Sequence, residues 1–211
     1  MSEMRTSRRN SRILLISSRS KIIFQFLQVC NVTAELSFVG DYADFGNLKF
    51  SFTAELTRSF LLLPEETYHP RMADYRIGVF FTERLEFGNM MSNSAPVYFA
   101  NRWRLEPSDT AAYRAGELVK PVKPIVFYID ENFPEWWKPY IKEGVEQWQE
   151  MFEKIGFKDA IFALDYPKDD PSFDPDNIKY SCVRYAPIGI QNAMGPSWVD
   201  PRSGEIINAS V

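Results

Sequence analysis

Histidine is almost absent from this chain, which contains one, His69, in 211 residues. A catalytic zinc normally takes three protein ligands, mostly histidines, and no helical His-Glu-x-x-His pair is present. There is also no Gly-x-Ser-x-Gly elbow, phosphate-binding glycine loop or Cys-x-x-Cys pair. The printed residues therefore carry none of these signatures of catalysis. We interpret His69, in a loop before a proline, as a solvent-facing or hydrogen-bonding side chain.

Cysteine and long apolar runs are also scarce. Cys30 and Cys182 lie far apart in sequence, and we interpret them as free thiols, so cysteine usage does not decide the compartment. No stretch approaches ~20 uninterrupted apolar residues, so no membrane span is expected. The apolar run at 13–16 is followed by two charges within 17–21, and we find no convincing signal peptide.

Charge is distributed unevenly along the chain. The formal net charge is −4, yet the first 21 residues hold five Arg and one Lys against one Glu. The rest of the chain is therefore clearly acidic, which disfavours nucleic acid as a partner. With 45% apolar and 15% aromatic residues, the chain has enough material for a globular core.

The sequence predicts a β-rich first half. Residues 1–34 are basic and without sustained periodicity, and we expect a poorly ordered segment there. Residues 35–120 are expected to form a β-rich domain, and residues 107–124, with three prolines, are the predicted linker. A domain boundary near residue 120 follows. Short runs rich in β-branched and aromatic residues predict strands at 33–39, 48–57, 59–63, 77–82 and 96–105.

Residues 121–211 predict a mixed sheet with one long helix. Apolar residues recur at steps of three and four from Trp137 to Ile155, and Gly156 suits a helix end, so a helix is expected over about 135–155. Asp200-Pro201 begins a turn that Gly204 can close with positive φ. Strands are expected at 125–129, 160–164 and 180–185, with a final hairpin over about 194–211. The predicted fold class is α+β.

Two clusters have a plain interpretation beside a functional one. Five aspartates crowd a proline-rich loop and either wrap a calcium ion or form a solvated acidic loop, which we favour. They are Asp165, Asp169, Asp170, Asp174 and Asp176. Trp136 and Trp137 either form a ligand platform or, as we favour, lie at the rim and in the core of the predicted helix packing.

The segment before the final hairpin is the candidate binding site. Small residues, Gly and Pro disfavour a central strand and suit an exposed sheet edge, where an extended peptide can bind through main-chain hydrogen bonds. A plain loop before the hairpin is the alternative. The candidate substrate-binding residues are Ala193, Met194, Gly195, Pro196, Ser197 and Trp198.

From about residue 50 to residue 211, the sequence resembles the large bacterial zinc-dependent metalloproteases of metzincin-like type. Many short blocks in one order carry the resemblance. They are Leu-Leu-Leu-Pro-Glu at 61–65, Arg-Trp-Arg-Leu-Glu-Pro at 102–107, Gly-Glu-Leu-Val at 116–119, Lys-Pro-Ile-Val-Phe-Tyr-Ile-Asp at 123–130 and Asp-Pro-Arg-Ser-Gly-Glu-Ile at 200–206, with shorter blocks at 70–71, 76–78, 144–145, 148–149, 152–153, 156–157 and 195–196.

The resemblance implies that residues 121–211 are the N-terminal half of a metzincin-like peptidase domain, preceded by a domain of unknown function. It implies that the zinc-binding His-Glu-x-x-His helix follows the final hairpin, beyond Val211, so no zinc ligand or catalytic residue falls on this chain. Zinc and a peptide or protein substrate are expected for the full-length protein, and the fragment alone is expected to be inactive. A periplasmic or cell-surface location is implied by the resemblance alone.

A second hypothesis comes from another functional class. The chain is then a non-catalytic peptide-binding or structural module that uses the exposed sheet edge. The two hypotheses differ in whether the reading frame continues past Val211 into a zinc motif. A third hypothesis, a calcium-dependent domain built on the loop at 165–176, predicts that calcium raises thermal stability.

Overall fold

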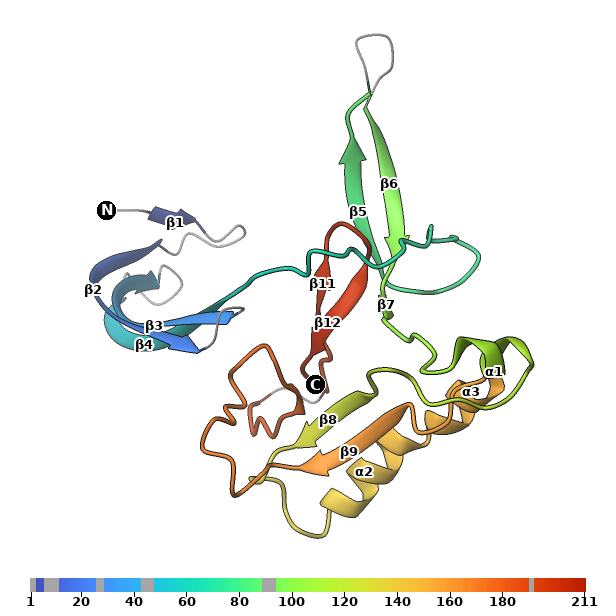
Figure 1. Cartoon of the computed structure of the whole chain (residues 1–211). Helices are drawn as coiled ribbons and strands as arrows, with labels where there is room; N and C mark the ends of the chain where they lie inside the picture. Colours follow the sequence, from blue (N-terminus) through green and yellow to red (C-terminus); the bar gives the residue numbers. More distant parts are fainter. Residues whose placement is uncertain (1–2, 6–11, 26–28, 43–47, 89–93, 190–191) are drawn as a thin grey trace. The chain divides into compact units, whose positions relative to one another are not determined.

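The first strands of the structure lie much earlier in the chain than the sequence pattern predicts. The computed structural model describes residues 3–5, 12–25, 29–42, 48–88, 94–189 and 192–211, and the chain divides into two units, Met1–Leu63 and Pro64–Val211. In the first unit, β1 (Glu3–Arg5), β2 (Arg12–Gln25), β3 (Val29–Tyr42) and β4 (Leu48–Leu61) form an antiparallel sheet in chain order (Figure 1).

The β3–β4 pair shows why this unit forms a sheet. Ala34 and Leu36 are buried, and they pair with Leu56 and Ala54 across the strands. The alternate residues on the other face are polar, and the Thr33 and Thr57 hydroxyls lie 3.0 Å apart. This alternation of apolar and polar residues is typical of antiparallel strands, and on the apolar face Leu56 of β4 remains 42% exposed.

Residues 1–34, which we expected to be poorly ordered, contribute β1, β2 and the start of β3 to this sheet. The registered β2–β3 pairing runs from Arg12 opposite Asp41 to Gln25 opposite Val29. Backbone pairing of this length does not need a regular apolar pattern in every strand, so a local scan of the sequence does not detect it.

The second unit begins with a hairpin of β5 (Phe81–Glu86) and β6 (Ala95–Ala100), paired antiparallel. The short strand β7 (Arg102–Trp103) follows directly. The predicted strand at 96–105 is thus divided at Asn101, whose amide donates to the Phe80 carbonyl.

The second unit contains a three-stranded parallel sheet. Its strands are β8 (Ile125–Ile129), β9 (Ile161–Asp165) and β10 (Ser181–Val183), in the order β10-β8-β9. They confirm the strands expected in this part of the sequence. Ile129 and Cys182 are about 1% exposed, so the apolar run at 125–129 is explained by burial at the centre of the sheet.

The long helix expected over 135–155 is wrong as one element. The structure contains α2 (Lys138–Glu146) and α3 (Gln149–Lys154), which lie along the β8–β9 side of the sheet (Figure 1). The chain turns at Gln147 and Trp148, and no residue of either helix is fully buried. Glu146 and Gln149, which flank the break, both bond to backbone amides at or just before β9, as described below. Trp137, expected in the core, is 38% exposed.

The final hairpin is confirmed. Strands β11 (Ser197–Asp200) and β12 (Glu205–Ala209) are antiparallel, and β12 also pairs in parallel with β7. Gly204 has φ of +74°, and its amide donates to the Asp200 carbonyl at 2.8 Å. An isolated parallel bridge between Cys182 and Ser210 connects the hairpin to β10.

The predicted linker at 107–124 is packed against the second unit. It contains α1 (Thr110–Arg114), whose first turn is capped by the Asp109 carboxylate. Val119, 5% exposed, forms a core cluster with Phe157 and Ala160. The contact division of the chain falls at Leu63, whereas the boundary expected from composition lies near residue 120. Proline and glycine mark turns here, and the apolar Val119 between them fixes the segment to the core.

The described residues combine strands with a few short helices, so the fold class is α+β. None of the described helices has the length and apolar character needed to cross a membrane.

Candidate functional site

The segment singled out from the sequence, residues 193–198, is exposed throughout. Met194 is 69% exposed and Trp198 46% exposed. Ser197 and Trp198 begin β11, which among the described strands has one neighbour, β12. A register irregularity lies between Trp198 and Val199, as bulges often do at sheet edges. The structure therefore places the candidate residues on and just before an exposed edge strand.

The outward direction of one backbone amide follows from the register. The Ser210 amide donates to the Pro196 carbonyl at 3.1 Å, so residues 196 and 210 form a hydrogen-bonded pair. Such pairs alternate with non-hydrogen-bonded ones in an antiparallel ladder, and the next pair is Ser197 opposite Ala209. The Ala209 amide indeed points away from β11 and donates to Ser181 Oγ. The Ser197 amide and carbonyl thus point away from β12, toward the open edge.

The turn below this edge is held by a buried carboxylate. Asp200 is 0% exposed and accepts from Arg202 Nε at 3.0 Å and Arg202 Nη2 at 2.7 Å. The hydrogen bonds from Arg202 hold the pKa of Asp200 below its usual value. Arg202 also donates to the Pro64 carbonyl, and Arg104 forms an ion pair with Glu205 at 2.8 Å. These hydrogen bonds and the ion pair hold the end of the edge strand in place.

In the separate parallel sheet, the outer edge of strand β9 is covered by helix side chains. Gln149 Oε1 accepts from the Ala160 amide at 2.8 Å, and Glu146 Oε1 accepts from the Ala163 amide at 3.2 Å. These helix side chains occupy positions that an added strand would need, which is a common way to protect a sheet edge. Strand addition is therefore hindered at β9 and open at β11.

Metal-binding side chains do not gather. Within the described ranges, no three His, Cys, Asp or Glu side chains form a group that could hold a metal ion. Burial raises the pKa of the Cys182 thiol to about 11, which disfavours the thiolate form that binds zinc. The Cys30 side chain lies outside the described ones. The described residues therefore do not fit the zinc that the resemblance implies for the full-length protein.

The aspartates of the 165–176 loop have separate partners. Asp165 pairs with Lys142 at 2.7 Å, and Asp176 pairs with Arg184 at 2.8 Å. Asp170 and Asp174 accept from backbone amides two residues further on, as Asx turns do. Asp170 also accepts from a serine hydroxyl, which lowers its pKa. The loop is thus stabilised by local bonds.

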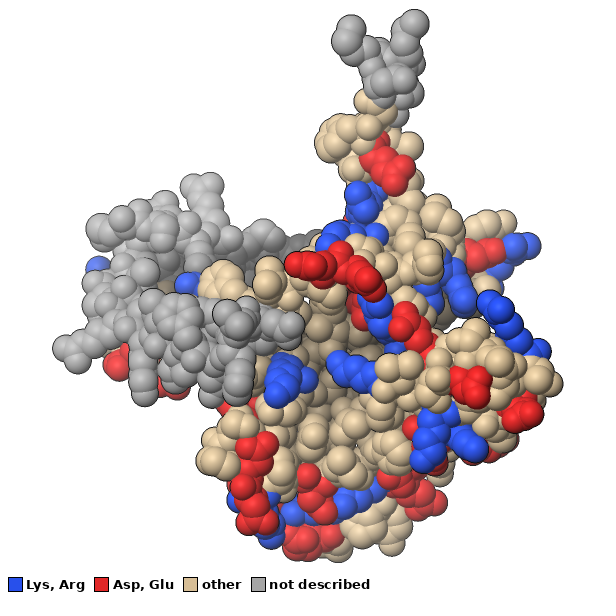
Figure 2. All heavy atoms as spheres, in the orientation of Figure 1, with Lys and Arg blue, Asp and Glu red and all other residues tan. Residues whose placement is uncertain are grey.

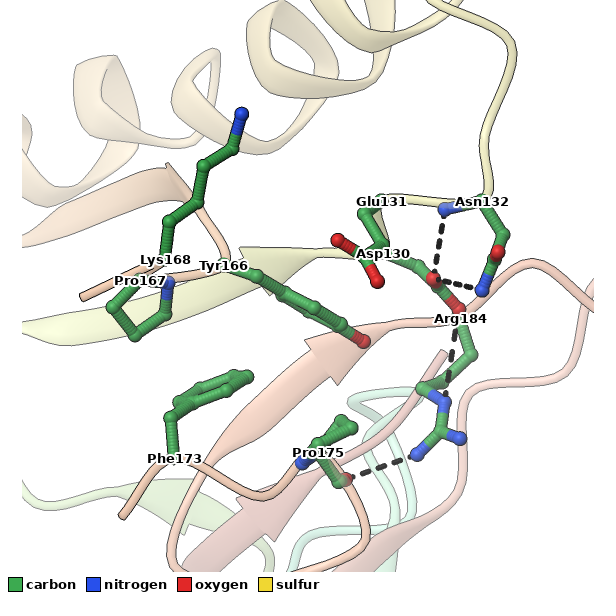
Figure 3. Close-up of a pocket in the computed structure, with 9 residues that line it drawn as sticks. All are labelled: Asp130, Glu131, Asn132, Tyr166, Pro167, Lys168, Phe173, Pro175 and Arg184. Carbon is green, nitrogen blue, oxygen red and sulfur yellow. Dashed lines mark hydrogen bonds and ion pairs between the residues drawn. The ribbon is translucent and has the colours of Figure 1, made fainter. Parts of the chain in front are cut away.

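A pocket of about 430 Å³ lies at the carboxyl ends of β8, β9 and β10. Three segments line it, 130–132 after β8, 166–168 after β9, and Arg184 after β10, together with the loop residues Phe173 and Pro175 (Figure 3). From β8 the chain crosses to β9 on one side, and from β9 it returns to β10 on the other side of β8. Ligands of open parallel sheets bind at such a switch point, outside the carboxyl ends of the strands.

Asp130 organises the pocket floor. It is 5% exposed, and its carboxylate accepts from both nitrogens of Asn132 and from the Tyr185 amide. Arg184 lies 3.9 Å from it and also donates to the Pro175 carbonyl (Figure 3). Partial burial alone would lower the pKa of Arg184, but its acidic partners raise it overall.

Sequence reasoning missed this pocket. The available signal is weak, because Asp130 simply follows the strand expected at 125–129 and Arg184 lies within the strand expected at 180–185. Their proximity depends on both strands being parallel neighbours, which neither local pattern reveals. On the visible face, acidic and basic side chains are interspersed over the second unit (Figure 2), in agreement with the mixed charges of the pocket.

The fold and these sites define a strand-rich α+β protein with an exposed strand edge and a charged pocket. The family model described as a domain of unknown function, DUF5117, matches residues 3–108, which is half of the chain, and the chain belongs to this family. Comparisons with curated proteins and with solved structures found no match. Both the β11 edge and the pocket lie outside the matched range.

Proposed function

We propose that this chain supplies the peptide-binding edge of a zinc-dependent metallopeptidase. Peptide-bond hydrolysis is the activity proposed for the full-length protein, and zinc is assigned to a segment that follows Val211. In this proposal the described residues bind and orient an extended peptide. None of them is assigned a catalytic role.

The observation that carries the proposal is the exposed edge of β11. An extended peptide can add to such an edge through main-chain hydrogen bonds, with alternate side chains giving selectivity. The outward Ser197 amide and carbonyl are the first pair available to it, and Trp198 and Met194 offer exposed apolar contacts. Coverage of β9 by Gln149 and Glu146 favours β11 as the place of addition.

The element order gives further support. Strand β8, helices α2 and α3, strands β9 and β10 and the β11–β12 hairpin follow one another in the order that the resemblance implies for the first half of the peptidase domain. The blocks of the resemblance extend into this hairpin, at 195–196 and 200–206.

A non-catalytic peptide-binding module is the second candidate. It uses the same edge, and it requires no metal-binding segment elsewhere in the protein. The two candidates differ in the product of the full-length gene. The peptidase proposal expects a protein that cleaves fluorogenic peptides and loses the activity on chelation, with recovery after zinc is restored. A full-length product that binds peptides without cleaving them would favour the module.

The edge itself is tested by substituting one backbone donor. Ser197→Pro removes the outward amide and leaves the β11–β12 hydrogen bonds in place, because this amide does not face β12. Ser197→Ala is the matched control, since it removes only the side-chain hydroxyl. We expect Ser197→Pro to weaken peptide binding, or to raise KM, by about tenfold, the equivalent of about 1.4 kcal/mol. Equal effects of the two substitutions would refute binding by strand addition.

A further inference from the structure

The pocket at the carboxyl ends of the parallel strands has two kinds of charged side chain. Asp130 and Arg184 are part of the internal network described above, and Arg184 is held by Asp176 as well. Lys168 and Glu131 are exposed, and neither forms an ion pair or hydrogen bond with another described residue. The charges open to a ligand are therefore one ammonium and one carboxylate.

These two charges come from different loops. Glu131 follows β8 and Lys168 follows β9, and Tyr166 extends from the β9 loop toward the Asp130 side of the pocket (Figure 3). A ligand with a single net charge would be attracted by one of the two groups and repelled by the other. A molecule that carries both charges is complementary to both.

Apart from Asn132, which donates to Asp130, the rest of the lining is apolar and aromatic. Phe173 packs against Tyr166, Tyr128 and Tyr180, with ring centroids 4.7–5.0 Å apart. Pro167 and Pro175 extend this wall. The cluster gives an apolar side chain of a ligand a fixed surface to pack against.

One polar group in this wall has only a weak partner. The Tyr166 hydroxyl is shielded from solvent and meets the Cys182 thiol, which is a weak hydrogen-bond partner. Burial raises the pKa of this hydroxyl, and the contact with Cys182 raises it further, so the hydroxyl stays protonated. A carboxylate or carbonyl oxygen on a ligand would be a stronger acceptor than the thiol.

We propose that this pocket binds a small zwitterion, an α-amino acid or dipeptide with an apolar side chain. The ligand carboxylate pairs with Lys168, its ammonium group pairs with Glu131, and its side chain packs on Phe173 and the prolines. A volume of about 430 Å³ is within the range of small-molecule sites and accommodates a ligand of this size. The site does not depend on peptidase activity or on the β11 edge.

The test uses phenylalanine and two analogues, each lacking one charge, titrated into the chain and followed by NMR. N-acetylphenylalanine lacks the ammonium group, and phenylalaninamide lacks the carboxylate. We expect phenylalanine to bind saturably at millimolar concentration or below. Each analogue should bind about fivefold more weakly, as expected for loss of a partly exposed charge pair.

Two variants assign the charges. Lys168→Met should weaken phenylalanine and N-acetylphenylalanine about fivefold, whereas phenylalaninamide, a cation that Lys168 repels, should bind no more weakly than before. Glu131→Gln should weaken phenylalanine and phenylalaninamide, whereas N-acetylphenylalanine, an anion that Glu131 repels, should bind no more weakly than before. Both side chains are exposed, so the fold is retained, and Lys158→Met, an exposed lysine outside the pocket, is the matched control.

The results that overturn the proposal are equally definite. The zwitterion site would be excluded if phenylalanine caused no saturable change in NMR chemical shifts, even at ten times the highest concentration at which binding is expected. If either variant weakened all three ligands equally, or if the control variant weakened them as much, Lys168 and Glu131 would not pair with separate charges of the ligand. Tyr166→Phe gives a further check, because loss of the hydroxyl should weaken phenylalanine when the bound ligand accepts a hydrogen bond from it.

Discussion

Replacement of Gly204 by alanine tests how the hairpin beneath the β11 edge is built. Two effects add at this position. The φ of +74° places Gly204 in the left-handed region, which costs an L-residue about 1–2 kcal/mol. A Cβ there would also lie 2.6 Å from the Ala100 carbonyl oxygen, a backbone atom that cannot move alone. Overpacking of this kind costs about 1–3 kcal/mol.

The expected total for Gly204→Ala is about 2–5 kcal/mol of unfolding free energy. Gly116→Ala separates the two effects, because Gly116 has φ of +86° and its added Cβ would meet nothing within 4 Å. It should cost only the strain, about 1–2 kcal/mol. Gly144→Ala is the control of opposite sign, since alanine in the open interior of α2 should stabilise by about 0.5–1 kcal/mol.

Urea and thermal unfolding followed by tryptophan fluorescence measure this series. For a unit of this size, Gly204→Ala should lower Tm by about 4–20 °C. The Gly204 carbonyl also accepts from the Arg102 amide at 3.0 Å, so exchange of that amide should accelerate. If Gly204→Ala destabilises no more than Gly116→Ala, the close approach to Ala100 is not a rigid feature of the fold and the reasoning is wrong.

Three further predictions concern buried groups. The pKa of Asp200 is lowered in the folded state, so Asp200 should stabilise the fold above about pH 4 and lose this contribution as pH falls through its folded pKa. Asp200→Asn should remove about 1–3 kcal/mol of this pH-dependent stability, measured by unfolding at pH 7 and pH 3. Gln149→Ala leaves the buried Ala160 amide without its acceptor, so we expect a loss of about 1–3 kcal/mol and faster exchange at that amide. Cys182, with a pKa of about 11, should be alkylated slowly at pH 8 in the folded chain and readily after unfolding, measured by peptide-resolved mass spectrometry.

The elements that the sequence predicts well are those specified by local chemistry. The hairpin follows from Asp200-Pro201 and a glycine at the position that needs positive φ, and the structure has that turn. The strand at 125–129 follows from an unbroken apolar run that only a buried position favours. In both cases neighbouring residues are sufficient to define the conformation.

The features that the sequence does not predict depend on distant partners. Strand β2 is polar and basic along much of its length, and it is defined by its register with β3. The division between α2 and α3 falls within an uninterrupted apolar periodicity. Gln149 and Glu146, on either side of the division, accept from the Ala160 amide just before β9 and from the Ala163 amide within it. Periodicity reports which face a helix buries and does not report where its backbone hydrogen bonding is interrupted.

The candidate site likewise has one feature that local sequence predicts and others that depend on distant partners. Exposure of residues 193–198 was predictable, because Gly195 and Pro196 disfavour a central strand. The outward direction of the Ser197 amide was not, since it depends on pairing with Ala209. Topology likewise brings Asp130 and Arg184 together at adjacent strand ends.

The two proposed binding surfaces can be tested separately because they belong to different parts of one framework. The edge acts through β11, and the pocket is lined by residues that follow β8, β9 and β10. They are connected at β10, where the Arg184 amide donates to the Val211 carbonyl at 2.7 Å and the Val211 amide donates to the Cys182 carbonyl at 3.0 Å. Both are main-chain hydrogen bonds, so substitution of the Arg184 side chain would remove its pocket contacts and leave the connection to the hairpin in place. Lys168, Glu131 and Ser197 lie outside this connection, so a loss of binding in their variants reports on one surface at a time.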